Sequence, residues 1–375
     1  MLDGFRSKLD LFRQKPLARY KVKIYPWNAE LDVNSGENLL ETVLQQGIVV
    51  PYNCRVGACK TCRIRVIDGH PKSLIEREYV FSQEEIRSGV YLACQTSIVS
   101  DMVIEWLHSE ENASNPELYQ NAQLLSIHKM TPRIHRIQIQ LENDISWNAG
   151  QFAQLLPLFP GAVPRCYSMI EEGGGSRILS FDITRYLDGK VSSWITDNGN
   201  IGKLLRVKAP YGDFGNVCPV EESNQSGPML YIAGGSGIGS IGGIIASHVK
   251  RNLKGKESNP VLLVIGARDS SEVYGLNSLQ SLLAVADTPF HVCVVLDREP
   301  LESKWSGRRG YVGEHLKEIL NEAGKSNIGF LKPYDLWQIL LCGPPPLVET
   351  SIEALISSGM QAKQISFDKY EQFIP

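Results

Sequence analysis

The sequence predicts a multidomain protein in which an α+β domain comes first, an antiparallel β-barrel second and an α/β domain with a parallel sheet last. Its 375 residues suffice for two to three domains of about 150 residues each. Two polar stretches without hydrophobic periodicity, 108–116 and 221–227, interrupt the chain and are expected to separate domains. The pattern of apolar residues changes across each stretch, so we expect a separate core in each segment.

The composition is that of an ordinary folded protein. Apolar residues make up 43% and charged residues 21% of the chain, which argues against a disordered or fibrous protein. The net charge of −3 disfavours a nucleic acid partner, because phosphate backbones are bound by basic surfaces. The sequence shows no apolar run of about 18 residues that would predict a transmembrane helix, and residues 1–20 do not have the pattern of a secretory signal. We therefore expect a cytoplasmic protein.

The first segment combines strands with one helix. Residues 19–33 show the period-two pattern of a strand pair. Ser35-Gly36-Glu37 predicts the start of a helix whose apolar residues recur at helical spacing, and Gly47 predicts its end. Further strands are expected at 63–67, 89–93 and 101–106.

Half of the eight cysteines lie within 41 residues of one another. Cys54, Cys59 and Cys62 have the spacing C-x4-C-x2-C, and Cys94 follows after 31 intervening residues. This spacing is typical of a [2Fe-2S] cluster held by four thiolates, and the intervening Gly57 leaves room for backbone amides near the sulfurs. A structural zinc site or unrelated buried thiols are the alternatives, although zinc sites favour paired C-x2-C units and only one is present.

Residues 20–107 resemble the plant-type ferredoxin module of bacterial oxygenase reductases. The resemblance implies a β-grasp fold for a domain spanning 19–108, a low reduction potential of about −400 mV, and transfer of one electron at a time. It also implies a donor that reduces the cluster and an external protein that accepts its electrons.

Short β-rich runs separated by turns fill the second segment. They lie at 134–141, 152–156 and 178–184. Many short strands of this kind predict an antiparallel barrel or sandwich.

The second segment also contains Arg165-Cys166-Tyr167-Ser168, which matches the R-x-Y-S pattern of the ferredoxin-NADP reductase superfamily. A guanidinium can clamp a phosphate, an aromatic ring can stack on a flavin and a hydroxyl can bond a ring nitrogen. The resemblance implies these roles for Arg165, Tyr167 and Ser168 respectively.

A downstream turn matches the G-x-x-S pattern of the same superfamily. The resemblance implies contact with a pyrophosphate at a helix start, and thus FAD rather than FMN, in a domain spanning 119–220. Taken singly, the pattern would be an ordinary turn. It consists of Gly189, Lys190, Val191 and Ser192.

Compact apolar strands separated by helix-length stretches predict a parallel sheet with both faces covered in the third segment. They lie at 229–233, 261–265, 291–295 and 338–342. The first of them runs into a glycine-rich turn and an apolar helix, which is the pattern of a dinucleotide-binding corner. The turn contains Gly234, Gly235, Ser236 and Gly237.

Cys342-Gly343-Pro344 resembles the C-G-P motif of the superfamily, which implies that the cysteine meets the nicotinamide beside the flavin. A small buried side chain at a strand end is the alternative for Cys342. The aromatic tail, 367–373, resembles the C-terminus of the oxygenase reductases. We expect it either to shield the flavin or to form a last strand.

Arg268 and the serines that follow Asp269 lie where the superfamily discriminates NADH from NADPH. The cation and the hydroxyls would hold a 2′-phosphate, whereas the aspartate would repel it. We expect NADH, with NADPH as the alternative, in a domain spanning 227–375.

The order of cluster, flavin and nicotinamide motifs resembles the reductase components of methane monooxygenase, benzoate dioxygenase and phenol hydroxylase. The resemblance implies an NAD(P)H-dependent oxidoreductase in which hydride passes to FAD, with Cys342, Ser168 and Tyr167 at the reacting centre. Single electrons then leave through the cluster to an external acceptor, expected to be an oxygenase component. Two alternatives stay open: the reductase of a deoxysugar dehydratase of the CDP-6-deoxyglucoseen type, and a redox sensor that does not turn over NADH.

Overall fold

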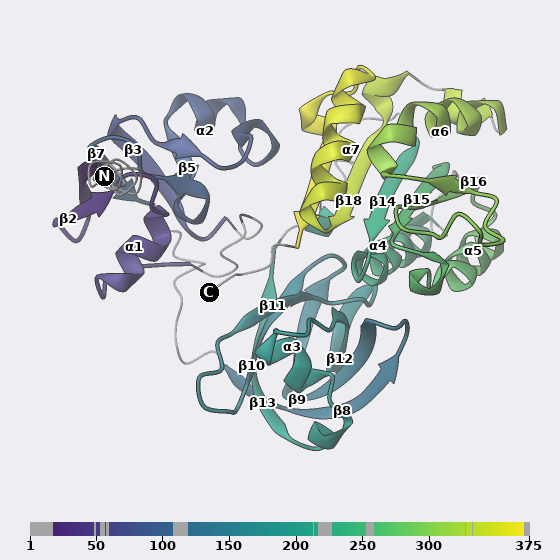
Figure 1. Ribbon diagram of the computed structural model, residues 1–375, viewed down its shortest axis with the longest axis horizontal. Coiled ribbons are helices and arrows are strands. Elements are labelled where there is room, and N and C mark those ends of the chain that lie inside the picture. The colour runs from purple at the N-terminus through teal and green to yellow at the C-terminus, as the bar shows by residue number, and fades with distance from the viewer. Residues whose placement is uncertain are drawn as a thin grey trace, which may run out of the picture. The chain divides into compact units, whose positions relative to one another are not determined.

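The computed structural model describes most of the chain, which divides into two compact units, residues 1–114 and 115–375 (Figure 1). The described residues are 18–48, 50–52, 57, 60–107, 119–212, 214–216, 227–252, 259–326, 328–331 and 333–370. Both predicted linkers lie largely outside these residues. The second unit holds two sheets, one antiparallel and one parallel.

The first unit contains a five-stranded mixed sheet and two short helices. Their bounds are β1 (Arg19–Tyr25), β2 (Ala29–Asn34), α1 (Leu39–Gln45), β3 (Arg63–Gly69), β4 (Lys72–Ser73), α2 (Gln83–Arg87), β5 (Val90–Leu92), β6 (Thr96–Ser97) and β7 (Met102–Trp106). The strand order is β2-β1-β7-β3-β5, with β1 and β7 parallel and the other pairs antiparallel. The alternating residues Val22 and Ile24 of β1 are fully buried and share a core with Leu39, Leu40 and Val43 of α1. The strands expected from the period-two pattern are all present.

Helix α1 begins later than the sequence predicted. Its N-cap is Asn38 rather than the preceding Ser35-Gly36-Glu37, because the Asn38 side chain accepts a hydrogen bond from the Glu41 amide at 3.2 Å. The Asn38 side chain, directly before the buried Leu39, satisfies an amide that the helix itself cannot. The predicted end at Gly47 is correct, and this glycine has a φ of +76°.

The second unit begins with a six-stranded antiparallel sheet that curls around its own core (Figure 1). Its elements are β8 (Gln120–Lys129), β9 (Ile134–Asn148), β10 (Phe152–Pro157), β11 (Arg165–Ser168), β12 (Gly173–Thr184), α3 (Lys190–Ile195) and β13 (Leu204–Tyr211). The order is β11-β10-β13-β8-β9-β12, and an isolated bridge between Met169 and Phe181 joins its two ends. Buried residues of the strands, including Leu124, Ile139 and Phe181, fill the interior.

The rest of the second unit is an entirely parallel six-stranded sheet with the order β17-β16-β15-β14-β18-β19. Its elements are β14 (Met229–Gly234), α4 (Gly237–Asn252), β15 (Val261–Ala267), α5 (Leu276–Val285), β16 (Phe290–Leu296), β17 (Arg308–Arg309), α6 (Val312–Ser326), β18 (Gln338–Gly343), α7 (Pro345–Ser357) and β19 (Ile365–Lys369). α4 and α5 pack on the face that carries Tyr231, Leu263 and Leu340, while α6 and α7 cover the other face (Figure 1). Within the described residues, no helix combines the length and the hydropathy needed to span a membrane.

The topology of this parallel sheet positions the candidate site. The carboxyl ends of β14, β15 and β18 lie at one edge, because parallel neighbours end on the same side of a sheet. Gly234 pairs with Gly266, and Ala233 pairs with Cys342. The glycine turn and the Cys342 motif, more than 100 residues apart in the chain, are therefore neighbours.

Candidate functional site

Two of the four predicted cluster cysteines lie together in the first unit. Cys62 immediately precedes β3, and Cys94 lies in a 3-10 helix, Ala93–Gln95. The Cys94 amide donates to Cys62 Sγ at 3.5 Å, and both side chains are buried. Such amide-to-sulfur contacts are typical of thiolates that hold a cluster. Cys54 and Cys59 lie outside the described residues, and the described remainder shows no further group of three metal-binding side chains.

Gly57, between Cys54 and Cys59 in the sequence, has little room for a side chain. Gly57 has a φ of +87°, and a Cβ added there would lie 3.1 Å from Gln95 Cγ. Only glycine adopts this backbone conformation without strain. The residues that the structure describes therefore fit the predicted cluster.

Asn38 is a residue of this site that the sequence analysis missed. Its side-chain Nδ2 donates to the carbonyl oxygen of Cys94 at 2.9 Å, while its Oδ1 caps α1. One side chain thus ties the helix start to the cysteine loop. No local pattern would have found it, because 56 residues separate the two partners.

The R-x-Y-S motif forms β11, at the edge of the antiparallel sheet. All four of its residues are half-buried, so their side chains remain accessible to a ligand. Burial raises the pKa of the Tyr167 hydroxyl, which is therefore neutral at physiological pH. The Ser168 hydroxyl donates to Oδ2 of Asp368, a residue of β19 in the parallel sheet, at 3.0 Å.

The G-x-x-S turn lies at the start of α3. A Cβ added to Gly189 would lie 2.3 Å from Ser192 Oγ, so a larger residue there would displace the serine hydroxyl. The Ser192 hydroxyl is buried and donates to the Gly189 carbonyl at 3.1 Å, which means that it holds the turn itself. Lys190 and Val191 form the first helical turn. The backbone amides of a first helical turn are suited to bind a phosphate group.

The glycine turn after β14 also has the geometry of a nucleotide site. A Cβ added to Gly235 would meet nothing within 4 Å, so the turn faces open space, whereas one added to Gly237 would lie 2.4 Å from the Cys342 carbonyl oxygen. The turn therefore lies directly against the end of β18. α4, which starts at Gly237, presents its N-terminal amides there, and such amides bind phosphates.

Two hydrogen-bonded contacts bring the flavin and nicotinamide motifs together through the last strand. Cys342 Sγ lies 2.9 Å from the Tyr370 hydroxyl, which is 3.1 Å from Ser240 Oγ at the start of α4. Asp368, two residues earlier, accepts from Ser168. The sequence analysis singled out Ser168 and Cys342 but assigned no role to their partners. Asp368 and Tyr370 are two residues apart, so in the expected strand they would lie on the same side. This alternation is the sequence feature that could have predicted their shared role.

Burial controls the protonation of this cluster. Burial raises the pKa of the Cys342 thiol and of the Tyr370 hydroxyl well above their ordinary values, so both stay neutral. Burial also raises the pKa of Asp368 to about 6, although the hydrogen bond from Ser168 opposes the shift. The arrangement thus offers two neutral hydrogen-bonding groups and one carboxylate that titrates near neutral pH.

Both serines in the loop after β15 donate hydrogen bonds to carboxylates. Asp269 Oδ1 accepts from both the amide and the hydroxyl of Ser271. The buried Glu299, from the loop after β16, accepts from the amide of Ser270 at 2.7 Å and from its hydroxyl at 3.2 Å. Arg268 is exposed. Glu299 is a further residue that the sequence analysis missed, because it lies 29 residues from its partner.

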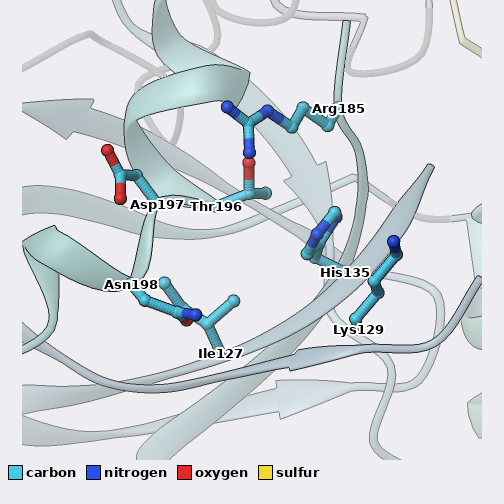
Figure 2. Close-up of a pocket in the computed structure, with 7 residues that line it drawn as sticks. All are labelled: Ile127, Lys129, His135, Arg185, Thr196, Asp197 and Asn198. Carbon is cyan, nitrogen blue, oxygen red and sulfur yellow. The ribbon is translucent and has the colours of Figure 1, made fainter. Parts of the chain in front are cut away.

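A separate cavity of about 230 Å³ opens on the antiparallel sheet, at the end of α3 opposite the G-x-x-S turn (Figure 2). Its lining combines basic, acidic and neutral polar side chains with one apolar residue: Ile127, Lys129, His135, Arg185, Thr196, Asp197 and Asn198. Desolvation, together with the charges of Arg185 and Lys129, lowers the pKa of His135. These residues all lie outside the three motifs.

Three protein-family models match successive parts of the chain. Residues 22–99 match a 2Fe-2S iron-sulfur cluster binding domain, residues 121–215 an oxidoreductase FAD-binding domain, and residues 231–352 an oxidoreductase NAD-binding domain. The chain is an iron-sulfur flavoprotein reductase built from these three kinds of domain. The reductase is thus an NAD(P)H-dependent oxidoreductase with three cofactors: a [2Fe-2S] cluster, FAD and a nicotinamide nucleotide.

Individual proteins resemble the reductase along almost its full length. The xylene/toluene monooxygenase electron transfer component XylA of Pseudomonas putida is 29% identical, and the alignment covers 91% of each chain. The phenol hydroxylase P5 protein of Acinetobacter pittii is 28% identical, with 94% of each chain covered. The crystal structure of the Amycolatopsis cytochrome P450 reductase GcoB superposes with a TM-score of 0.60 at 25% identity, covering 93% of the reductase and 98% of GcoB.

The raised pKa of Asp368 makes the stability of the reductase depend on pH. The carboxyl binds its proton more tightly in the folded state, with a pKa of about 6 against an ordinary value of 3.8. Its contribution to the free energy of unfolding is therefore complete below about pH 4 and is lost as the pH rises through about 6, amounting to about 3 kcal/mol. Urea unfolding at pH 4.5 and 7, with FAD saturating, would measure this. Asp368→Asn should flatten the slope, and an unchanged slope in that variant would contradict the assignment.

Proposed function

We propose that the reductase delivers electrons from NADH, through FAD and the [2Fe-2S] cluster, to the oxygenase component of a multicomponent oxygenase. The observation that carries the proposal is the pair of contacts Ser168–Asp368 and Cys342–Tyr370, which put the flavin motif beside the nicotinamide motif. When bound, FAD accepts a hydride and passes electrons on singly. The acceptor is inferred from the relatives, whose names describe parts of monooxygenase and hydroxylase systems.

The residues of the parallel sheet are assigned to binding and orienting the nucleotide. We assign the diphosphate to the amides of Gly234, Gly235, Ser236 and Gly237, where the turn faces open space. We assign the nicotinamide to Cys342, Gly343 and Pro344, which would form the floor of its site. The buried Cys342 thiol is neutral and excludes water there.

The residues of the antiparallel sheet are assigned to the flavin. Arg165 would hold the phosphate, Tyr167 would stack on the ring, and Ser168 would place a hydroxyl at the polar edge of the ring. Asp368 orients that hydroxyl through its hydrogen bond. The amides at the start of α3 add a second phosphate contact, in the turn formed by Gly189, Lys190, Val191 and Ser192.

We further propose three domains: a β-grasp ferredoxin domain at 19–108, a flavin domain with a closed antiparallel barrel at 119–220, and a nucleotide domain at 227–375. The mixed sheet crossed by α1 supports the first assignment. The bridge between Met169 and Phe181, at opposite ends of the curled sheet, supports closure of the second. A cytoplasmic location follows from the proposed cluster, because its thiolates must stay reduced.

NADH is the proposed nucleotide because both serines that would bind a 2′-phosphate already donate hydrogen bonds to carboxylates. Hydrogen bonds from Ser270 hold the pKa of Glu299 below its ordinary value, so it is a carboxylate at neutral pH. Asp269 adds a second negative charge. We expect kcat/KM for NADH to exceed that for NADPH, and the double variant Asp269→Asn/Glu299→Gln to raise kcat/KM for NADPH about 10-fold. Ferricyanide reduction measures both values. A wild-type preference for NADPH would contradict the assignment.

An anaerobic visible spectrum of the purified protein, titrated with NADH, tests the proposed function. Flavin and cluster absorbance, both bleached by substoichiometric NADH, would support the electron path. Addition of an oxidised oxygenase component should then restore both bands. Cofactors that stay oxidised in NADH would favour a redox sensor, and cluster absorbance missing after anaerobic preparation would contradict the assignment of the four cysteines.

A further inference from the structure

The contact between the antiparallel and the parallel sheet contains a buried carboxylate from each side. Asp182, on β12, has a fully buried side chain and accepts from Arg136 Nε and Nη2, both at 2.8 Å. It also accepts from the hydroxyl of Tyr274, which belongs to the parallel-sheet side, at 2.9 Å. Arg136, in the same sheet, thus neutralises the charge of Asp182. The hydrogen bond from Tyr274 connects the Asp182 carboxylate to the parallel-sheet side.

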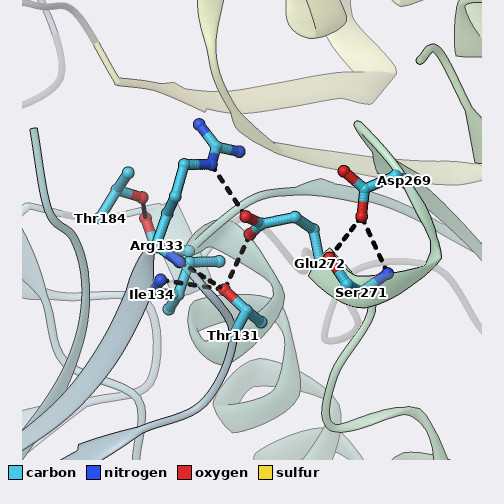
Figure 3. Close-up of polar contacts among 8 residues, drawn as sticks. Thr131, Arg133, Ile134, Thr184, Asp269, Ser271 and Glu272 are labelled. Carbon is cyan, nitrogen blue, oxygen red and sulfur yellow. Dashed lines mark hydrogen bonds and ion pairs between the residues drawn. The ribbon is translucent and has the colours of Figure 1, made fainter. Parts of the chain in front are cut away.

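Glu272 makes the reciprocal contact from the parallel-sheet side (Figure 3). Its carboxylate accepts from Thr131 Oγ1 at 2.7 Å and from Arg133 Nε at 2.9 Å, and its side chain is 6% exposed. Thr131 Oγ1 in turn accepts from the amide of Ile134, which holds the turn between β8 and β9. Both partners of Glu272 therefore belong to one ordered turn of the antiparallel sheet.

The two carboxylates lie next to the segments that are assigned to the nucleotide. A Cβ added to Gly239, in the first turn of α4, would lie 2.2 Å from Asp182 Oδ2. One added to Gly243, a helical turn later, would lie 2.5 Å from the carbonyl oxygen of Ile170. Ser236, in the glycine turn, lies 3.3 Å from Thr184 of β12, measured between the two hydroxyl oxygens. The start of α4 thus rests directly on the antiparallel sheet.

The loop of Ser270 and Ser271, at the other end of the proposed nucleotide site, is also connected to the contact between the two sheets. Glu272 and Tyr274 directly follow Ser270 and Ser271, the loop to which we assign the adenosine ribose. Movement between the two sheets would therefore shift both the diphosphate turn and the ribose loop relative to the flavin motif. Hydride transfer is sensitive to such shifts, because a displacement of about 1 Å can cost about 100-fold in rate.

We propose that Asp182, Glu272 and Tyr274 are positioning residues that hold the nucleotide-binding domain against the flavin domain and thereby set the approach of the nicotinamide to the flavin. The inference rests on the proposed function of the reductase. A purely structural role would appear as lower stability with an unchanged rate of flavin reduction. A positioning role lowers the rate in protein that is folded and has nucleotide bound.

Anaerobic stopped-flow reduction of the holoenzyme by NADH separates these roles. Tyr274→Phe keeps the ring and removes the one hydroxyl, and Glu272→Gln keeps the shape and removes the charge. Each variant should lower the limiting rate of flavin reduction about 10-fold, while the Kd of NADH from the same traces stays within about threefold of wild type. Flavin and cluster absorbance and thermal unfolding report whether each variant is folded, and Tyr274→Phe alone suffices if Glu272→Gln does not accumulate.

Glu172→Gln is the matched control. Glu172 forms an ion pair with Lys250 of α4 that joins the same two domains, but the side chains are 39% and 64% exposed. Exposed pairs of this kind contribute little, so the limiting rate should equal that of wild type. Limiting rates in Tyr274→Phe and Glu272→Gln that also equal wild type would overturn the inference, and so would an equal slowing in Glu172→Gln. Wild-type flavin that NADH does not reduce would instead contradict the proposed function itself.

Discussion

Cys94→Ser is expected to lower NADH-dependent cytochrome c reduction by about 100-fold or more while leaving ferricyanide reduction within about threefold of wild type. Cys94 is buried beside Cys62, and its replacement removes one of the four thiolates that we propose to hold the cluster. Ferricyanide takes electrons from reduced flavin, so its reduction does not require the cluster. Steady-state assays with the two acceptors, together with iron analysis, provide the measurement.

Cys293→Ser is the control for this experiment. Cys293 is also buried, but it lies on β16, in the other unit of the chain. Its Sγ accepts a hydrogen bond from Arg308. Its substitution should leave both acceptor activities and the iron content unchanged. Cytochrome c reduction that survives in Cys94→Ser would show that electrons leave the protein without passing through the cluster.

Gly237→Ala is expected to lower kcat/KM for NADH by about 100-fold or more, with flavin and cluster absorbance intact. The added Cβ would lie 2.4 Å from the Cys342 carbonyl oxygen and 2.8 Å from its carbonyl carbon. These are backbone atoms in the middle of a parallel sheet, so they cannot move aside as a side chain could. The glycine turn must shift instead, and the diphosphate and the nicotinamide that we propose to bind there would shift with it.

Gly242→Ala serves as the matched control in the same helix. The nearest atom to its added Cβ is Leu279 Cδ2 at 3.4 Å, an ordinary contact. Alanine also favours a helix interior over glycine by about 1 kcal/mol, so this variant should be at least as stable as wild type and fully active. Equal kcat/KM values in the two variants would show that the contact between the glycine turn and Cys342 has no role in using NADH.

Local patterns predicted most of the secondary structure because they depend on neighbouring residues alone. The alternation in β1 and the apolar runs of β14 and β15 identify strands whatever surrounds them. The start of α1 was misplaced because Ser35, Gly36 and Asn38 are all acceptable near a helix start. Asn38 is the residue that caps the helix, and its side chain also donates a hydrogen bond to the Cys94 carbonyl, 56 residues away.

The sequence by itself determined which cofactors the reductase takes, because cysteine spacing and glycine turns are local requirements of a cluster and a diphosphate. Only the tertiary structure showed how the separate motifs meet. Ser168 and Asp368 are 200 residues apart, and Asp182 and Tyr274 are 92 apart, yet each pair shares a hydrogen bond. The physical reason is that such contacts follow from strand order and from the packing of one sheet on the other. These depend on burial summed over the whole unit and leave no short pattern in the chain.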